Sequence, residues 1–176
     1  KDGAGGNDII ANSFYSGGTI GFYIYSDGDT AQAITNDVLL SDGAEKWHHI
    51  VYVADSAVSG PNGLKIYFDG KLQRLNSSYN GDTSSVVFAD YVSTENLYFG
   101  ARNGGSATAD NHFAGNIGKM AIWNVSLSEA NIRANMFADC NGLSNQSVLV
   151  SCYQFDEGTG TTVADSIGRN DGTASG

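Results

Sequence analysis

The stretch Glu45-Lys-Trp-His-His-Ile-Val-Tyr-Val-Ala54 and the stretch Gly63-Leu-Lys-Ile-Tyr-Phe-Asp-Gly-Lys-Leu72 follow one another across a Gly/Pro/Asn break. Both are rich in aromatic and β-branched residues, which favour β-strands. The dipeptide Asp69-Gly70 predicts a tight hairpin, because both central residues of a type I′ turn need a positive φ. The sequence therefore predicts two neighbouring strands, the second of which folds back on itself at this dipeptide.

Further strand patterns recur along the chain, separated by clusters of turn-forming residues. They cover residues 9–14, 19–25, 31–40, 46–54, 64–68 with 71–74, 85–89, 96–102, 111–114, 116–124 and 148–155. The chain has 23 Gly and 1 Pro, which suits short strands joined by tight turns. About ten strands without intervening helices predict an antiparallel sandwich or barrel.

One segment has a helical period instead. Ser126-Leu-Ser-Glu129 has the form of a capping box, in which the serine oxygen accepts a first-turn N–H and the glutamate reaches back. Apolar residues follow at helical spacing, and the Asn-Gly pair at 141–142 ends the pattern. We therefore predict a short helix over Ser128–Ala138.

The overall composition excludes some partners. The formal net charge is −10, which argues against nucleic acid, whose phosphates must be neutralised by Lys and Arg. It argues equally against an anionic membrane surface. No apolar run approaches the ~20 residues that span a bilayer, so we expect no membrane insertion.

The 176 residues suit one domain, so we expect a single domain over residues 1–176 with an irregular tail over 156–176. The chain opens on a polar Gly-rich segment without an initiating Met and closes on another. We therefore expect it to be processed from, or excised out of, a longer protein.

Five segments, taken in order, carry a family resemblance. They are Trp47-His-His-Ile-Val51, Gly63-Leu-Lys-Ile-Tyr-Phe-Asp-Gly-Lys71, Asn96-Leu-Tyr-Phe-Gly100, Phe113-Ala-Gly-Asn-Ile117 and Ala121-Ile-Trp-Asn-Val-Ser-Leu-Ser-Glu129. This order resembles the laminin-G-like, pentraxin-like branch of the concanavalin A-like lectin/glucanase superfamily. The resemblance implies a jelly roll of two curved sheets. We therefore predict an all-β antiparallel β-sandwich with one short helix near the C-terminus.

The C-terminal part leaves two alternatives open. The motif Phe155-Asp-Glu-Gly-Thr-Gly160 often opens a domain of this family, but here it follows the predicted helix. Either residues 148–155 form a closing strand of the same domain, or they begin a second copy. The alternation of apolar residues along this segment favours the closing strand.

Catalytic residues are not predicted. Relatives that hydrolyse glucans carry a Glu-x-Asp-x-x-Glu or Glu-x-Asp-x-Glu strand, which sets two carboxylates about 5–5.5 Å apart. No such triplet occurs in this sequence, and the adjacent Asp156 and Glu157 point to opposite faces if extended. His48 and His49 have no catalytic partner in the local sequence. We therefore expect no enzymatic activity.

Aromatic residues indicate a binding surface, because sugars stack their C–H faces on rings while polar groups read their hydroxyls. A sandwich also buries many aromatic side chains as core, and the sequence does not separate the two roles. Our candidate ligand-binding residues are Tyr23, Tyr25, His48, Tyr52, Arg102 and Trp123.

Calcium is a possible cofactor, because many relatives of this fold hold one Ca²⁺ at the sandwich rim. Asp165, Asn170 and Asp171 supply hard oxygen atoms within one short loop, as Ca²⁺ requires. The alternative is a set of solvated turn residues that make Asx-turns. The family commonly carries an Asp in the strand after Phe113-Ala-Gly115, and this sequence has none there, which weakens a metal site carried over from relatives.

Two cysteines, Cys140 and Cys152, lie close in the sequence. In an oxidising compartment they would form a disulfide, and elsewhere they would be two buried thiols. Because the composition is typical of secreted proteins, we favour the disulfide and a secreted, extracellular or particle-surface location.

The predicted function is a non-catalytic extracellular module for carbohydrate binding or adhesion. Its expected partners are glycans or surface glycoproteins, with neighbouring domains or copies of itself as further candidates. The first alternative is a structural or interaction domain of a surface fibre, secreted adhesin or virion component. The second is a glycan-degrading enzyme with an unrecognised site.

Overall fold

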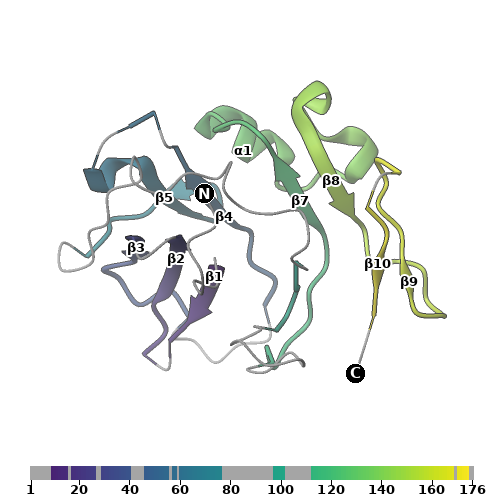
Figure 1. The fold of residues 1–176 in the computed structure, drawn as a ribbon, viewed down its shortest axis with the longest axis horizontal. Helices are drawn as coiled ribbons and strands as arrows, with labels where there is room; N and C mark the ends of the chain where they lie inside the picture. Colours follow the sequence, from purple (N-terminus) through teal and green to yellow (C-terminus); the bar gives the residue numbers. More distant parts are fainter. Residues whose placement is uncertain are drawn as a thin grey trace. The chain divides into compact units, whose positions relative to one another are not determined.

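The computed structural model describes residues 9–15, 17–26, 29–40, 46–55, 57–58, 60–76, 97–101, 112–168 and 170–174. The chain divides into two compact units, residues 1–112 and 113–176, which we describe separately (Figure 1). In the described residues every strand pair is antiparallel, and the one α-helix lies near the C-terminus. This confirms the predicted fold class. No described helix is long and apolar enough to cross a bilayer.

The first unit begins with a three-stranded meander. Its strands are β1 (Ile9–Phe14), β2 (Ile20–Ser26) and β3 (Asp29–Ile34), in the order β1-β2-β3. Ile20, Phe22 and Ile24 alternate along β2 and are all buried, so they form the core face of the sheet. Tyr23 lies between them and faces the opposite side. The predicted strand 31–40 ends earlier than expected, at Ile34.

The second sheet contains the hairpin on which the prediction was based. Its strands are β4 (Ile50–Ala54), β5 (Leu64–Phe68) and β6 (Lys71–Leu72), with the short 3-10 helix η1 (Gly60–Gly63) before β5. Asp69 has φ 48° and Gly70 has φ 73°, so both turn residues are left-handed. Phe68 pairs with Lys71 across the turn. The predicted two-residue hairpin is therefore confirmed.

The two sheets of the first unit share one hydrophobic core. Its buried members are Ile20, Phe22, Ile24, Ala31, Ala33, Leu64 and Ile66. An isolated antiparallel bridge between Thr35 and Leu75 joins the end of β3 to the chain beyond β6. Thr35 is 1% exposed, and its hydroxyl accepts a hydrogen bond from the Ile20 amide at 3.0 Å. The sheets are thus linked through backbone pairing as well as through packing.

The second unit is built around β7 (Met120–Trp123) and β8 (Leu149–Tyr153), which pair antiparallel. The sequence left open whether residues 148–155 close the domain. Their pairing with β7 joins them to the strand just before the helix, as a closing strand requires. The tail predicted to be irregular contains a small ladder of β9 (Thr162–Val163) and β10 (Gly172–Thr173).

The helix α1 spans Glu129–Asn135, which is shorter than predicted. Its N-cap is Ser128, whose side chain accepts the Asn131 amide, so the predicted capping box starting at Ser126 is wrong. Leu127 is buried, and the N-cap lies two residues later than the sequence motif suggested. The Lys119 ammonium donates to the carbonyls of Asn135 and Ala138, which lie at and just beyond the C-terminal end of α1. It therefore supplies hydrogen bonds to backbone carbonyls at that end of the helix.

Two predicted strands are not formed in the described residues, and a third prediction is not tested. Residues 85–89 lie outside the described residues. The described part of 96–102 has no strand, and Gly100 with φ 75° breaks the extended conformation there. Residues 112–114 also have no strand, and the Phe113 ring lies against Gly115.

Candidate functional site

The side of the β1–β2–β3 sheet opposite the core carries a group of aromatic and amide side chains. Tyr23 in β2 pairs with Gln32 in β3, so the two side chains lie beside each other on this side. Tyr15 follows β1, and its hydroxyl accepts a long hydrogen bond of 3.4 Å from the Gln32 amide. Tyr15 is 40% exposed. We call the surface formed by Tyr15, Tyr23 and Gln32 the tyrosine face.

A glycine holds the Tyr15 ring against the sheet. A Cβ atom placed on Gly21 would lie 2.7 Å from Tyr15 Cε2, which is closer than atoms can approach. The ring therefore lies directly over the Gly21 backbone, and a side chain at this position would displace it. The backbone of Tyr15 is fixed as well, since its amide donates to Thr19 and its carbonyl accepts from Gly18. The turn between β1 and β2 thus positions the ring.

Only part of this surface was predicted from the sequence. Tyr23 was predicted as a ligand residue and lies on the tyrosine face. Tyr25 belongs to β2 and pairs with Thr30, but its side chain is outside the described set. Arg102 lies outside the described residues. Tyr15 and Gln32 were missed; the alternation along β3 could have indicated Gln32, whereas Tyr15 belongs to a turn.

A second polar arrangement lies at the β5–β6 hairpin. His48 Nδ1 lies 3.0 Å from Asp69 Oδ2, and the His49 amide donates to Asp69 Oδ1 at 2.9 Å. The imidazole of His48 also stacks on Phe68, with ring centroids 4.6 Å apart. These contacts fix the segment before β4 to the hairpin. His48, predicted as a ligand residue, therefore has a structural role here.

The electrostatics of Asp69 follow from these contacts. Burial alone would raise the pKa of the Asp69 carboxyl, but the hydrogen bonds from the His49 amide and the His48 imidazole lower it below its ordinary value. A lowered pKa in the folded state means that ionised Asp69 stabilises the fold. This stabilisation is present above the ordinary Asp pKa of about 4 and is lost as the pH falls through the lower folded value.

We expect Asp69→Asn to reduce the acid sensitivity of the fold. Asparagine tolerates the left-handed turn conformation and keeps an acceptor for the His49 amide, so the loss of stability at neutral pH should be small. Urea unfolding of both proteins from neutral pH to below about pH 4 measures the effect. The difference in unfolding free energy should shrink on acidification. A constant difference over this range would contradict the assignment.

Two other predicted ligand residues lie in packed surroundings. Tyr52 packs its ring on Phe22, with centroids 5.1 Å apart, and contacts the core of the first unit. Burial raises the pKa of its phenol. Trp123 in β7 packs against the cluster around Cys140 and Cys152. Both side chains are half-buried and pack against these core clusters, so we do not take them further as ligand contacts.

The loop predicted to bind calcium contains a network of hydrogen bonds. Asp165 is 4% exposed, and its Oδ1 accepts the amides of Cys152 at 2.9 Å and Ile167 at 3.1 Å. Its Oδ2 accepts the Asn170 amide at 3.2 Å, while Asp171 Oδ1 accepts the Asp165 amide at 2.9 Å. These contacts use both oxygens of Asp165 and one oxygen of Asp171 as acceptors of backbone hydrogen bonds, and calcium binding by this loop stays a prediction.

The side chain of Asn170 is also engaged, since its amide donates to the Ser151 hydroxyl at 2.9 Å. Within the described parts of the chain, no three His, Cys, Asp or Glu side chains gather as metal ligands would.

A shallow polar pocket of about 250 Å³ lies near this loop in the second unit. It is lined by Asp139, Cys140, Asn141, Gln154, Asp156 and Ser166. Of its two carboxylates, Asp139 already accepts the Gly142 amide through Oδ1.

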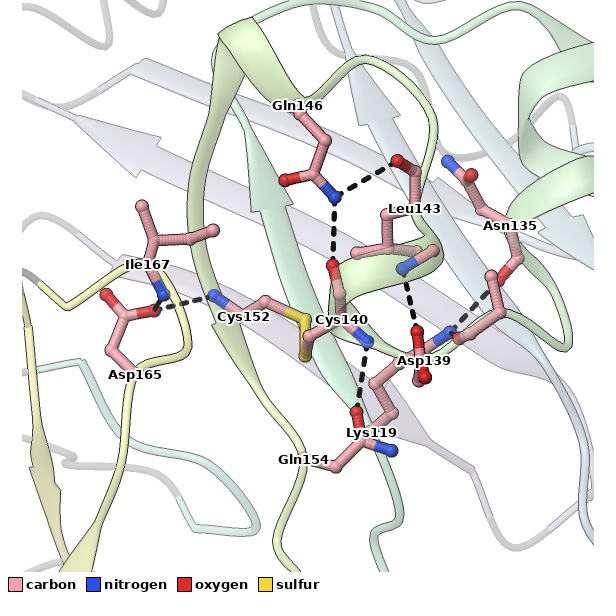
Figure 2. Close-up of a disulfide and its surroundings, with 12 residues drawn as sticks. Lys119, Asn135, Asp139, Cys140, Leu143, Gln146, Cys152, Gln154, Asp165 and Ile167 are labelled. Atoms are coloured by element: carbon pink, nitrogen blue, oxygen red, sulfur yellow. Dashed lines mark hydrogen bonds between the residues drawn. A yellow bond between two sulfur atoms is a disulfide. The ribbon is translucent and has the colours of Figure 1, made fainter.

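The predicted disulfide between Cys140 and Cys152 is present (Figure 2). It joins the 3-10 helix η3 (Cys140–Gly142) to β8. The Cys140 backbone amide donates to Gln154 Oε1, and the side-chain amide of Gln146 donates to the Cys140 and Leu143 carbonyls. The disulfide thus lies inside a network in which the polar backbone atoms around it are satisfied.

Comparison with known proteins identifies the class of domain. Residues 2–133 match the family model of the concanavalin A-like lectin/glucanases superfamily. Because the match covers most of the chain, the chain belongs to this family. Neither a search of curated proteins nor a search of solved structures gives a match. The family comprises both sugar-binding lectins and glucanases, so the class of protein is a carbohydrate-binding or related module.

Proposed function

We propose that this chain is a non-catalytic, extracellular carbohydrate-binding module that contacts its glycan through the tyrosine face. The family supports carbohydrate recognition in general. The observation that carries the proposal is the placement of Tyr15, Tyr23 and Gln32 together on the side of a sheet that faces away from the core.

The tyrosine face has the chemistry that a sugar ring requires. Phenol rings offer apolar surface for the C–H face of a pyranose, and their hydroxyls both donate and accept hydrogen bonds. The carboxamide of Gln32 also donates and accepts, so it matches a sugar hydroxyl in either role. Because Tyr15 and Gln32 contact one another, a bound sugar would meet a prearranged pair of polar groups.

Two further observations support the other parts of the proposal. The described side chains of the tyrosine face include no pair of carboxylates, whereas glycoside hydrolysis uses two of them flanking the scissile bond. The disulfide supports an extracellular location, since disulfides persist in oxidising compartments. The rings and the amide of this face therefore support sugar binding without cleavage.

Affinity electrophoresis in gels with immobilised polysaccharides, followed by a glycan array, tests the proposal. We expect Tyr23→Ala to weaken binding by about tenfold, equivalent to about 1.4 kcal/mol. Gly21→Ala should weaken binding too, because it displaces the Tyr15 ring without removing it. Its effect on stability should be small, since the displaced atoms belong to the end of a flexible side chain.

Trp47→Ala serves as the matched control. Trp47 is 70% exposed but lies outside the β1–β2–β3 sheet, so its loss should leave binding unchanged. If only Trp47→Ala lost binding, the glycan site would lie near the β5–β6 hairpin and not on the tyrosine face. Failure of every glycan to bind at millimolar concentration would overturn the proposed function.

A further inference from the structure

The polar pocket of about 250 Å³ in the second unit is built from residues other than those of the tyrosine face. Three segments line it, namely residues 139–141, Gln154 with Asp156, and Ser166. The disulfide and a hydrogen bond from the Cys140 amide to Gln154 Oε1 hold the first two segments together (Figure 2). The Ser166 amide donates to the Cys152 carbonyl at 2.8 Å and holds the third. We call this hollow, whose walls are fixed by covalent and hydrogen bonds, the disulfide pocket.

Several polar atoms of the lining make no hydrogen bond within the described residues. Asp139 accepts the Gly142 amide through Oδ1 at 2.7 Å, which leaves Oδ2 as an open acceptor. Gln154 uses Oε1 for the Cys140 amide, so its NH2 group remains as a donor. The same part of the chain offers no hydrogen-bond partner to the side chains of Asn141, Asp156 and Ser166. The pocket therefore presents both acceptors and donors that the fold itself does not use.

The backbone is strained where the chain passes this pocket. Phe155 lies between Gln154 and Asp156 and has φ 56°, a left-handed conformation that bulky residues rarely adopt. Its ring stacks on Tyr153, with ring centroids 6.2 Å apart, which helps to hold the residue in place. Strained residues of this kind are concentrated at ligand sites, where the surrounding structure maintains them. The position of Phe155 therefore supports a binding role for the pocket that it borders.

We propose that the disulfide pocket binds a primary ammonium group that carries a neighbouring hydroxyl, as in a sugar with a free amino group. This second site goes beyond the proposed function, because it lies in the second unit and uses none of the residues of the tyrosine face. It also does not depend on sugar binding by that face.

The first reason is charge. The described residues of the lining include the carboxylates of Asp139 and Asp156, both exposed, and no Lys or Arg. Lys119 interacts electrostatically with Asp139, but its ammonium donates to two carbonyls at the end of α1. A ligand ammonium supplies a positive charge and three N–H donors for the open carboxylate oxygens. It therefore matches the acceptors of this lining better than a neutral group does.

The second reason is the set of uncharged polar groups beside the carboxylates. The Asn141 carboxamide and the Ser166 hydroxyl both donate and accept, and the Gln154 NH2 group donates. Such groups match a hydroxyl of the ligand in either role. A calcium ion would instead take about six to eight oxygen ligands, more than the carboxylates of this lining supply. The mixture of groups therefore favours an amine with hydroxyls over a metal ion.

NMR titration of the isotopically labelled protein tests the inference through its backbone amide signals. The probes are glucosamine, glucose, in which a hydroxyl replaces the amino group, and methylammonium, which has the charge without the hydroxyls. At about pH 6, where the amino group is protonated, glucosamine should shift the Cys140, Asn141 and Ser166 signals and approach saturation by about 50 mM. Glucose and methylammonium should each bind at least about threefold more weakly.

Three variants separate the two reasons. Asp156→Asn keeps the size of the side chain and should weaken glucosamine binding about fivefold, as expected for the loss of one well-placed exposed ion pair. Asp37→Asn makes the same change of net charge at an exposed position of the first unit and should leave the binding unchanged. Ser166→Ala should weaken binding of glucosamine but not of methylammonium, because it removes a hydroxyl that would contact the sugar.

The inference and the proposed function fail in different ways. Equal binding of glucose and glucosamine at the pocket signals would overturn the selection of an ammonium group. If no probe shifts these signals, or if calcium chloride shifts them more strongly than glucosamine does, the site is not the one proposed. Tyr23→Ala should leave glucosamine binding at the disulfide pocket unchanged, and its loss there would also overturn a separate site. None of these results alters the polysaccharide test of the tyrosine face.

Discussion

Replacing Asp165 with alanine is expected to lower the free energy of unfolding by about 4 kcal/mol. The carboxylate is buried and accepts three backbone amides, those of Cys152, Ile167 and Asn170. Hydrogen bonds to a charged group contribute about 1.5–3 kcal/mol each, and they are not fully additive. Alanine also leaves the Cys152 amide, in the centre of β8, without its acceptor.

Thermal and urea unfolding measure this effect, and the midpoint temperature should fall by about 10 °C. Asp156→Ala is the matched control, because Asp156 is exposed in the same tail and should change stability by no more than about 0.5 kcal/mol. Asp165→Asn should be less destabilising than alanine, because its oxygen can still accept the Cys152 and Ile167 amides while its NH2 group meets only the Asn170 backbone N–H. A loss below about 1 kcal/mol in Asp165→Ala would show that the network is not needed for stability.

Loss of the disulfide is expected to cost about 3 kcal/mol of unfolding free energy. Cys140 and Cys152 are 12 residues apart. Closing a loop of this length lowers the conformational entropy of the unfolded chain, which is equivalent to about 3 kcal/mol. The bond also ties η3 to β8 within the second unit. We expect the double variant Cys140→Ala/Cys152→Ala to unfold at lower urea concentration.

The control for this experiment is the reductant itself. Dithiothreitol should destabilise the original protein to about the level of the double variant and leave the double variant unchanged. Equal stability of the oxidised and reduced protein would contradict the assigned contribution. If the reductant also destabilised the double variant, its effect on the original protein could not be assigned to the disulfide.

Much of the fold could be predicted from local patterns. The strands at Ile9–Phe14 and Leu64–Phe68 have the predicted bounds, and the turn at Asp69-Gly70 has the predicted backbone. These features depend on residues close together in the sequence. The helix cap was misplaced because Ser126 and Ser128 are both residues that favour an N-cap, and in the folded chain Ser128 accepts the Asn131 amide.

The candidate site was harder to predict, because it depends on tertiary placement. Tyr15 belongs to a turn, and only the missing side chain of Gly21 lets its ring reach the sheet. Asp165 and Asp171 have the composition of a calcium loop, and the same oxygens serve equally well as acceptors for backbone amides. Composition alone does not separate these roles, since the donors come from residues that the loop meets only in the folded chain.

The pairing of β7 with β8 bears on where this domain should be cut for expression. The family match ends at residue 133, inside α1, whereas the strand that pairs with β7 is Leu149–Tyr153. A recombinant fragment trimmed to the family boundary would lose that strand, both cysteines and the Asp165 network. It would leave the backbone of Met120–Trp123 open to pairing with other molecules, which favours aggregation. Fragments intended for binding studies should extend at least to Thr173.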